Sequence, residues 1–283
     1  MDKDFLTLDE IKQVQLDMLD AFDGFCKENN LTYWLTEGSL LGAVRHHGYI
    51  PWDDDLDLGM PISSYLKLLE LASSDEGHEF FTNHNIRVAE NGVPSDIPYH
   101  QTFAKLYDTR TQASKGILAY EREGFIESVF IDIFPVVGLT DTPEEAEKLK
   151  KLSKYYANLR YSSEAFWPAA RIEGKKRFIK RLVGYLPARA KGYKYWLNAF
   201  CELRNTFPDP FDYEAFAMPD TESLRFALGK NIKTALYQFE GRMIPSFQDY
   251  DTFLSIHYGN YMQFPPEEER VPLHAQDFWW VCQ

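Results

Sequence analysis

The sequence predicts an α+β fold, with a mixed sheet and flanking helices in residues 1–140 and a mainly helical part in residues 141–283. Two patterns support this prediction. Apolar runs of period two alternate with apolar residues at helical spacing in the first part, whereas helical spacing prevails in the second. Hydrophobic residues make up 45% of the chain and charged residues 26%, a globular balance that excludes wholesale disorder.

The first helix is predicted directly behind a capping box. Thr7 has the N-cap side chain, and Glu10 follows three residues later, as the reciprocal hydrogen bonds of a capping box require. We expect this helix to end between Lys27 and Asn30. The apolar residues at helical spacing behind the box are Leu8, Ile11, Val14, Met18, Leu19, Phe22 and Cys26.

Two short strands and two helical segments are predicted next. Residues 31–36 are rich in β-formers, and Gly38-Ser39 breaks this first strand before a helical turn over residues 40–45. Asp55 to Leu58 alternate polar and apolar, so they predict a second strand, which Pro61 ends. Residues 63–73 predict a helix.

Residues 82–115 mix short apolar runs with Asn, Gly and Pro, which predicts strands and loops, including a strand over residues 103–107. A stronger strand is predicted over residues 128–135. It places Asp132 on one face and Val129, Ile131 and Ile133 on the other.

The later part of the chain is predicted to be helical from residue 142 to about residue 207. It begins with a helix over residues 142–157, in which acids precede lysines. We expect breaks at Pro168, Gly184 and Pro187, and short elements in the remainder. A shift in composition near residues 139–143 separates this part from the first.

Composition excludes several classes of protein. A net charge of −13 disfavours nucleic-acid binding through a general surface field. The N-terminus shows no secretory signal, and no window of 18 residues is free of charge. Cys26, Cys201 and Cys282 have neither metal-ligand spacing nor a disulfide framework. We therefore expect a soluble cytoplasmic protein with reduced thiols.

The acidic run before Pro61 is the most informative segment. On a strand, Asp55 and Asp57 would share one face, and two such close carboxylates repel each other unless a cation lies between them. Asp132 would supply a third acid from a neighbouring strand. Oxygen-only ligands suit Mg²⁺ or Mn²⁺. The alternative is a solvated acidic turn at Asp53 and Asp54, with another Asp paired to an arginine.

Gly38-Ser39 adds a phosphate-binding signal upstream of the acidic strand. Glycine allows close backbone approach, and the following amides with the Ser39 hydroxyl can hold a phosphate. Gly-Ser, then Asp-x-Asp, then an isolated Asp in a strand is the arrangement of a nucleotidyltransferase-type palm.

Four blocks of the chain resemble the LicD family, which groups bacterial phosphorylcholine transferases with eukaryotic fukutin-type proteins. The long first block covers residues 37–57 and is the most specific. The other blocks cover residues 103–111, 130–135 and 258–268. The departures are mild: Leu56 and Leu58 stand where isoleucine is usual, and Asn260 where aspartate is usual.

The resemblance implies a nucleotidyltransferase fold and a cytidine-diphosphate-linked donor such as CDP-choline or another CDP-alcohol. Family members move the phosphorylated alcohol onto a sugar hydroxyl and release CMP. Carried over by position, Asp55, Asp57 and Asp132 would be metal ligands, and Gly38 and Ser39 would face the donor phosphates. One or two divalent ions there would offset charge on the diphosphate.

Other side chains receive roles with open alternatives. Asp53 and Asp54 are candidates for the general base. Glu37 either supports the site from behind or is an exposed loop acid. Three basic residues could contact phosphates or could instead form salt bridges with the acid-rich chain. They are Arg45, Lys105 and Arg110.

Residues 171–194 hold nine basic residues against one acid, with apolar residues interleaved. A basic amphipathic helix is typical of contact with a membrane surface, which would suit a lipid-linked glycan acceptor at the inner face of the cell membrane. The alternatives are a solvated helix face or a groove for acceptor phosphates.

Three functions are compatible with these patterns. The first is a metal-dependent phosphotransferase acting on a cell-surface glycan or teichoic acid precursor, with residues 1–140 as catalytic core and residues 141–283 completing the core and the acceptor site. The second is a nucleotidyltransferase that modifies a small molecule with a nucleoside monophosphate. The third is a non-catalytic binding protein of the same fold, against which the presence of all three acids argues.

Overall fold

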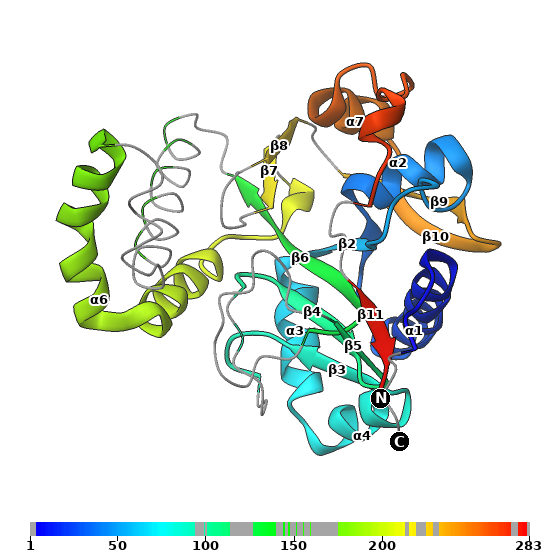
Figure 1. Ribbon diagram of the computed structural model, residues 1–283, viewed down its shortest axis with the longest axis horizontal. Coiled ribbons are helices and arrows are strands. Elements are labelled where there is room, and N and C mark those ends of the chain that lie inside the picture. Colours follow the sequence, from blue (N-terminus) through cyan, green and yellow to red (C-terminus); the bar gives the residue numbers. More distant parts are fainter. Residues whose placement is uncertain are drawn as a thin grey trace.

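The computed structural model in Figure 1 is built around one mixed sheet with helices packed against it. It describes residues 4–93, 99, 101–113, 127–139, 175–212, 215–218, 225–228, 232–272 and 277–281, with single residues between 144 and 159. The two ends of this described chain meet, because Phe5 forms a β-bridge with Trp279. Most of the predicted helix over residues 142–157 lies outside the described residues, although residues 144, 147, 151 and 155 are described and helical; Pro168 lies outside them as well.

The central sheet has the strand order β1-β2-β6-β4-β3, and β7 and β8 extend it from the distal half of β6. Strands β2 and β6 are parallel, whereas the other neighbouring pairs are antiparallel, so the predicted mixed sheet is confirmed. The strands are β1 (Trp34–Leu35), β2 (Asp57–Pro61), β3 (Ile86–Ala89), β4 (Ala104–Asp108), β6 (Phe130–Leu139), β7 (Ala215–Met218) and β8 (Arg225–Leu228).

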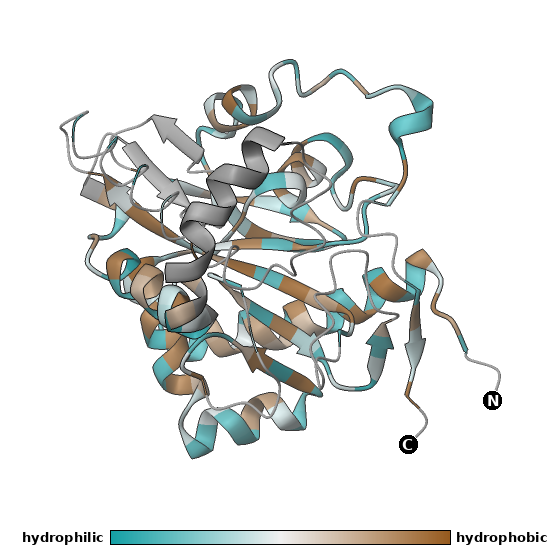
Figure 2. Cartoon of the chain, turned by 60° about the vertical axis from the view of Figure 1, so that its left-hand side comes forward, coloured by the Kyte–Doolittle hydropathy of each residue, from teal (hydrophilic) through white to brown (hydrophobic). Residues whose placement is uncertain are grey.

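Helix α1 (Leu8–Glu28) confirms the prediction from local sequence. Both hydrogen bonds of the capping box between Thr7 and Glu10 are formed. Its apolar face is buried with the central strands in one hydrophobic core, and Figure 2 shows brown hydrophobic residues along those strands. Helices α2 (Glu37–His46), α3 (Ile62–Ala72) and α4 (Asp75–Asn83) follow. No pattern had predicted α4, which Ser74 caps by accepting a hydrogen bond from the Gly77 amide.

The second half of the chain adds strands as well as helices. A hairpin of β9 (Thr234–Phe239) and β10 (Arg242–Phe247) packs against α2, and β11 (Phe278–Trp280) pairs with β5 (Thr111–Ala113). Helix α7 (Tyr250–Tyr258) lies beside α2, and two short 3-10 turns are η2 (Pro210–Asp212) and η3 (Glu267–Glu269). The second half is therefore less helical than predicted. Among its described residues, β7 and β8 join the sheet of the first half, and β9, β10 and β11 form further strands.

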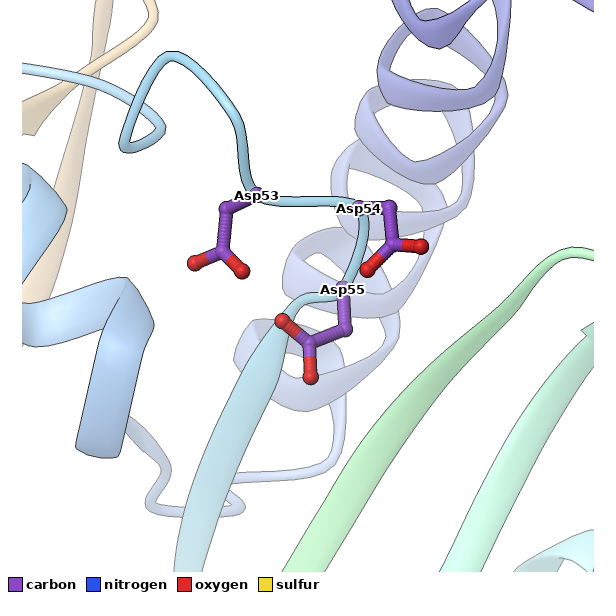
Figure 3. Close-up of side chains that lie close together, drawn as sticks. All are labelled: Asp53, Asp54 and Asp55. Atoms are coloured by element: carbon purple, nitrogen blue, oxygen red, sulfur yellow. The ribbon is translucent and has the colours of Figure 1, made fainter. Parts of the chain in front are cut away.

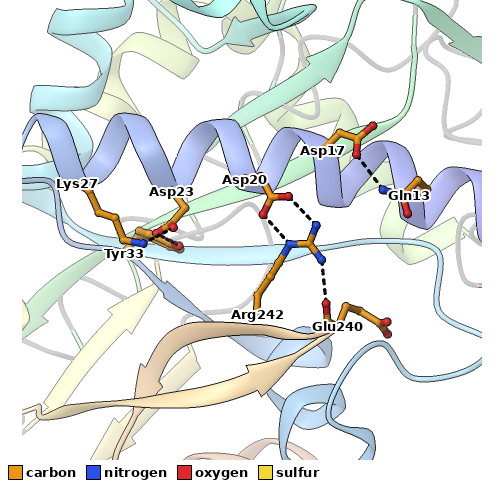
Figure 4. A network of polar contacts seen from close by, with 8 residues as sticks. All are labelled: Gln13, Asp17, Asp20, Asp23, Lys27, Tyr33, Glu240 and Arg242. Carbon is orange, nitrogen blue, oxygen red and sulfur yellow. Dashed lines mark hydrogen bonds and ion pairs between the residues drawn. The ribbon is translucent and has the colours of Figure 1, made fainter.

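The hairpin is tied to α1 by an exposed ion pair. Arg242 donates from Nε and Nη2 to the two carboxylate oxygens of Asp20, each at 2.6 Å, and from Nη1 to the Glu240 carbonyl at 2.8 Å (Figure 4). On the same helix face, Tyr33 donates to Asp23 at 2.8 Å.

Helix α6 (Lys175–Arg204) corrects the predicted breaks. The backbone stays helical through Gly184 and Pro187, and departs from helical geometry at Gly192, where φ is 77°. One glycine costs a helix only about 1 kcal/mol, so Gly184 need not end it. Gly192 adopts a left-handed conformation that glycine tolerates better than other residues.

No helix among the described residues is both long and apolar enough to cross a membrane. Cys26 and Cys201 are buried free thiols, and Cys282 lies outside the described residues. Burial raises the pKa of the Cys26 thiol well above its ordinary value, which makes this side chain unreactive.

Candidate active site

The strand register brings two predicted ligands together at the start of the parallel pair. Asp57 is the first residue of β2, and it lies directly beside Asp132 of β6. On the other side of β6, Lys105 of β4 lies directly across from Asp132. Side chains at paired positions share one face of a sheet, so all three point to the same side.

The alternation predicts Asp55 on the strand, but β2 begins only at Asp57. Asp55 therefore lies in the loop before the strand. The amide of Asp57 donates to the Ser39 hydroxyl at 2.8 Å, so a side chain from α2 holds the strand entrance. Asp53, Asp54 and Asp55 instead form the loop before β2, and one carboxylate oxygen from each lies within 4.8 Å of the others (Figure 3). Asp54 is buried, whereas Asp53 and Asp55 are half-buried.

These carboxylates raise the pKa values of one another. The pKa of Asp53 is raised to about 8, first by burial and then by Asp55 and Asp54, against the weaker opposing effect of Lys12. The pKa of Asp57 is raised well above its ordinary value by burial, followed by repulsion from Asp55 and Asp132. The loop acids and the strand acids therefore form one electrostatic cluster with an excess of negative charge. We call Asp53, Asp54, Asp55, Asp57 and Asp132 the acidic cluster.

Lys105 is the nearest cation in this cluster that the described contacts show. Its Nζ lies 2.8 Å from Oδ1 of Asp132 and 3.4 Å from the centre of the Phe130 ring. Both members of the pair are buried, with side chains 7% and 10% exposed. Two roles were open for Lys105, a contact with phosphate or a salt bridge with an acid. In this structure Lys105 forms a salt bridge with Asp132.

Gly38 and Ser39 lie in the first turn of α2, and not in a loop between two strands. A Cβ atom at Gly38 would lie 3.1 Å from Oδ2 of Asp53, so glycine here leaves room for the acidic cluster. The Ser39 hydroxyl is committed to the Asp57 amide and is buried. From the N-terminal turn of α2, Gly38 therefore leaves space for Asp53, and Ser39 holds the start of β2.

The structure separates the other two predicted phosphate contacts. Arg45 lies near the end of α2 and donates to the Tyr261 carbonyl at 2.9 Å. Arg110 follows β4 and donates from Nε and Nη2 to Oδ2 of Asp108 at 2.9 and 2.7 Å. Asp108 is three residues beyond Lys105, so its side chain points to the opposite face of β4. Arg110 is thus held away from the acidic cluster.

Sequence patterns missed a contact between Glu37 and His257. Glu37 starts α2 with a left-handed φ of 45°, and Nδ1 of His257, from α7, lies 3.3 Å from its Oε2. The side chain of His257 is 2% exposed, and its Nε2 has no partner among the described residues. Glu37 is buried, and its charge contributes to the raised pKa of Asp57. Of the two alternatives for Glu37, the exposed loop acid is therefore wrong. No local signal marks His257 as its partner.

The basic segment lies on α6 only in part. Residues 171–174 lie outside the described residues, and the backbone from Lys175 onward is helical. Among its described side chains, Lys191 is exposed and stacks on the Tyr195 ring, with Nζ 4.1 Å from the ring centre. Lys194 is exposed as well.

Known proteins resemble this chain over very different lengths. The lipopolysaccharide cholinephosphotransferase LicD of Haemophilus influenzae is 29% identical over 278 residues, which are 96% of this chain and 97% of that relative. The human ribitol 5-phosphate transferase FKRP is 41% identical over 54 residues, 19% of this chain and 11% of the relative. Mannosyltransferase regulator 4 of Saccharomyces cerevisiae is 42% identical over 52 residues, 18% of this chain and 4% of the relative.

The family description "LicD/FKTN/FKRP, nucleotidyltransferase domain" matches residues 30–179, which is more than half of the chain. The matched stretch contains the acidic cluster, Lys105 and the first turn of α2. The resemblance seen in the four sequence blocks is therefore confirmed: this chain belongs to the LicD/FKTN/FKRP family.

Proposed function

We propose that this protein is a phosphotransferase that moves phosphocholine, or a related alcohol phosphate, from a CDP-linked donor to a sugar hydroxyl and releases CMP. The observation that carries the proposal is the parallel register that places Asp57 beside Asp132, with Asp55 within electrostatic reach. The names of the two relatives, a cholinephosphotransferase and a ribitol 5-phosphate transferase, support the group that is transferred. The acceptor we propose is a cell-surface glycan or teichoic acid precursor.

The acidic cluster fits a divalent cation. Its side chains offer only oxygen atoms, and burial with mutual repulsion raises the pKa values of Asp53 and Asp57. A cation would remove that repulsion, and oxygen donors favour Mg²⁺ or Mn²⁺. We propose Asp55, Asp57 and Asp132 as the residues that hold it. When bound, such an ion neutralises negative charge on the diphosphate and on the leaving CMP.

The chain's own side chains would prepare the site for transfer. Ser39 fixes the start of β2 through the Asp57 amide, and Lys105 balances part of the charge of Asp132. Asp53 is our first choice for the general base, because its carboxylate lies beside those of Asp54 and Asp55 and it is less buried than Asp54. Asp53 would accept the proton of the acceptor hydroxyl as that oxygen attacks phosphorus.

We place the protein in the cytoplasm, with peripheral contact at the inner face of the membrane through residues 171–194. Exposure of Lys191 and Lys194 on α6 supports this, and Figure 1 shows α6 on the opposite side of the molecule from α1 and the β9–β10 hairpin. Residues 1–140 would form the catalytic core, and residues 141–283 would complete it and form the acceptor site. Flotation with vesicles of anionic lipid at low salt tests the contact, and a protein that stays unbound would contradict it.

A panel of CDP-alcohols tests the reaction. The full chain is incubated with CDP-choline, CDP-ribitol or CDP-glycerol, a glycan acceptor, and Mg²⁺ or Mn²⁺, and CMP release is measured. We expect acceptor-dependent CMP release with one donor, and its loss when a chelator is added. Pyrophosphate release from a nucleoside triphosphate, with no CMP from any donor, would instead support a nucleotidyltransferase.

A further inference from the structure

Two arginines from distant parts of the chain meet on the same aromatic side chain. Arg45 comes from α2, and Arg270 follows the short turn η3. Their Cζ atoms lie 4.6 and 5.5 Å from the centre of the Phe264 ring, and Cζ of Arg270 lies 5.6 Å from the centre of the Trp52 ring. Phe264 is 44% exposed, so this group opens to solvent. We call these four residues the arginine cluster.

Neither guanidinium has a carboxylate partner in the part of the chain that the structure describes. Arg45 donates to the Tyr261 carbonyl and to Nε2 of His46, both at 2.9 Å. Arg270 donates to the Pro265 carbonyl at 3.0 Å. All three acceptors are neutral atoms, because the pKa of His46 is lowered by burial and by Arg45.

Lack of acids does not explain these unpaired charges. The chain carries 43 acids against 30 basic residues. Three exposed glutamates, Glu267–Glu269, directly precede Arg270, yet none forms an ion pair with it. The two arginines also repel each other, since Arg270 contributes, after burial, to the lowered pKa of Arg45. Two like charges held together without an anion create a strong local preference for one.

We propose that Arg45 and Arg270 form a phosphate-binding site beside the acidic cluster. A guanidinium has five N–H donors in a flat fork that matches phosphate oxygens, and Phe264 and Trp52 hold the two forks by stacking. Trp52 adjoins Asp53 in the chain, and Arg45 lies six residues, or about 9 Å, along α2 from Ser39. The site therefore lies within reach of a ligand that also touches the acidic cluster.

The identity of the ligand rests on the proposed function. Under that function the phosphate can come from two sources. It belongs either to the CDP-linked donor or to a phosphorylated acceptor. Both present the same chemistry to the arginines. The test separates them by using CDP as one probe and hexose 6-phosphate as the other, with cytidine as the probe that lacks phosphate.

Binding is measured by calorimetry on the full chain with Mg²⁺ present. We expect R45Q and R270Q each to bind one phosphate-bearing probe about ten- to a hundredfold more weakly, because a hydrogen bond to a charged group is lost. Cytidine binding should not change. R242Q is the matched control, since Arg242 is paired with Asp20 away from the cluster. R270K, which keeps the charge, should restore part of the affinity, and thermal melting confirms that each variant is folded.

The outcomes decide the proposal and keep it apart from the transfer reaction. Weakened CDP binding assigns the phosphate to the donor, and weakened hexose 6-phosphate binding assigns it to the acceptor. If both probes bind R45Q and R270Q within twofold of R242Q, or if the wild type binds neither probe, the phosphate site is wrong. CMP release with unchanged binding overturns only this site. Selective loss of binding without CMP release overturns only the proposed reaction.

Discussion

Two buried acids, Glu90 and Asp57, show opposite ways of placing a carboxylate inside this protein. Glu90 receives hydrogen bonds from Arg204 and Tyr65, each at 3.3 Å, and Arg204 also donates to the Thr102 carbonyl at 2.7 Å. The Arg204 guanidinium opposes the effect of burial on the pKa of Glu90. At Asp57 the principal neighbours are other carboxylates, and each of them raises its pKa further.

This difference distinguishes a structural ion pair, Glu90 with Arg204, from a proposed cation site, the acidic cluster. Glu90 and Arg204 are compensated by each other, so they fasten the end of α6 to the end of β3 without any further partner. In the acidic cluster burial and the other carboxylates outweigh the nearby cations, because the pKa of Asp53 is raised in spite of Lys12 and the pKa of Asp57 is raised although Lys105 is paired with Asp132. Buried charge of one sign is costly unless something neutralises it, so this cluster is where a cation is expected.

The largest effect is expected from removing charge in the acidic cluster. D55N and D57N should each reduce CMP release by about 10³-fold or more, because the proposed metal ligands are lost. Circular dichroism and thermal melting should show a folded protein. Turnover within tenfold of the wild type would rule out these residues as the site.

Breaking the compensated pair should instead harm the fold. R204M leaves Glu90 buried without its guanidinium, and we expect a loss of about 3 kcal/mol in the free energy of unfolding. Urea denaturation at neutral pH measures it. Adding E90L to R204M should recover part of the loss. If R204M were as stable as the wild type, the two kinds of buried acid would not differ.

In the metal-free protein, the stability that Asp53 contributes should fall as pH rises. The pKa of Asp53 is raised from 3.8 to about 8, so the folded state holds this proton more tightly than the unfolded state. Its contribution is present below pH 3.8 and is lost as pH rises to about 8. In chelator at pH 9, D53N should be about 2 kcal/mol more stable than the wild type, with no gain at pH 4. An equal effect at both pH values would contradict the raised pKa.

The smallest effect is expected at the exposed pair of Arg242 and Asp20 (Figure 4). R242Q should lower the free energy of unfolding by less than about 1 kcal/mol, because solvent screens exposed ion pairs. Urea denaturation compares it directly with R204M. A loss as large as that of R204M would mean that burial does not set the strength of ion pairs in this chain.

Local sequence predicted the features that depend on local interactions. The capping box at Thr7, the end of β2 at Pro61 and the helix after it all follow from residues a few positions apart. The pairing of Asp57 with Asp132 agrees with the expectation that a second strand would bring a third acid.

Features set by distant contacts were not predictable in this way. Asp55 lies before the strand, whose first residue, Asp57, donates its amide to Ser39 from another element. Arg270 meets Arg45, and His257 meets Glu37, only after the C-terminal part has packed against α2. The sequence spacing of Arg45, Arg270, Glu37 and His257 does not indicate which helix or loop will pack beside each of them.

The acidic cluster also depends on the parallel pairing of β2 with β6, which brings Asp57 and Asp132 together. A slip of one residue in that pairing would turn Asp57 to the other face of the sheet from Asp132. A chain that emerges from the ribosome only as far as β4 holds the loop acids but lacks Asp132. The proposed set of Asp55, Asp57 and Asp132 is therefore complete only once β6 has paired with β2 in this register.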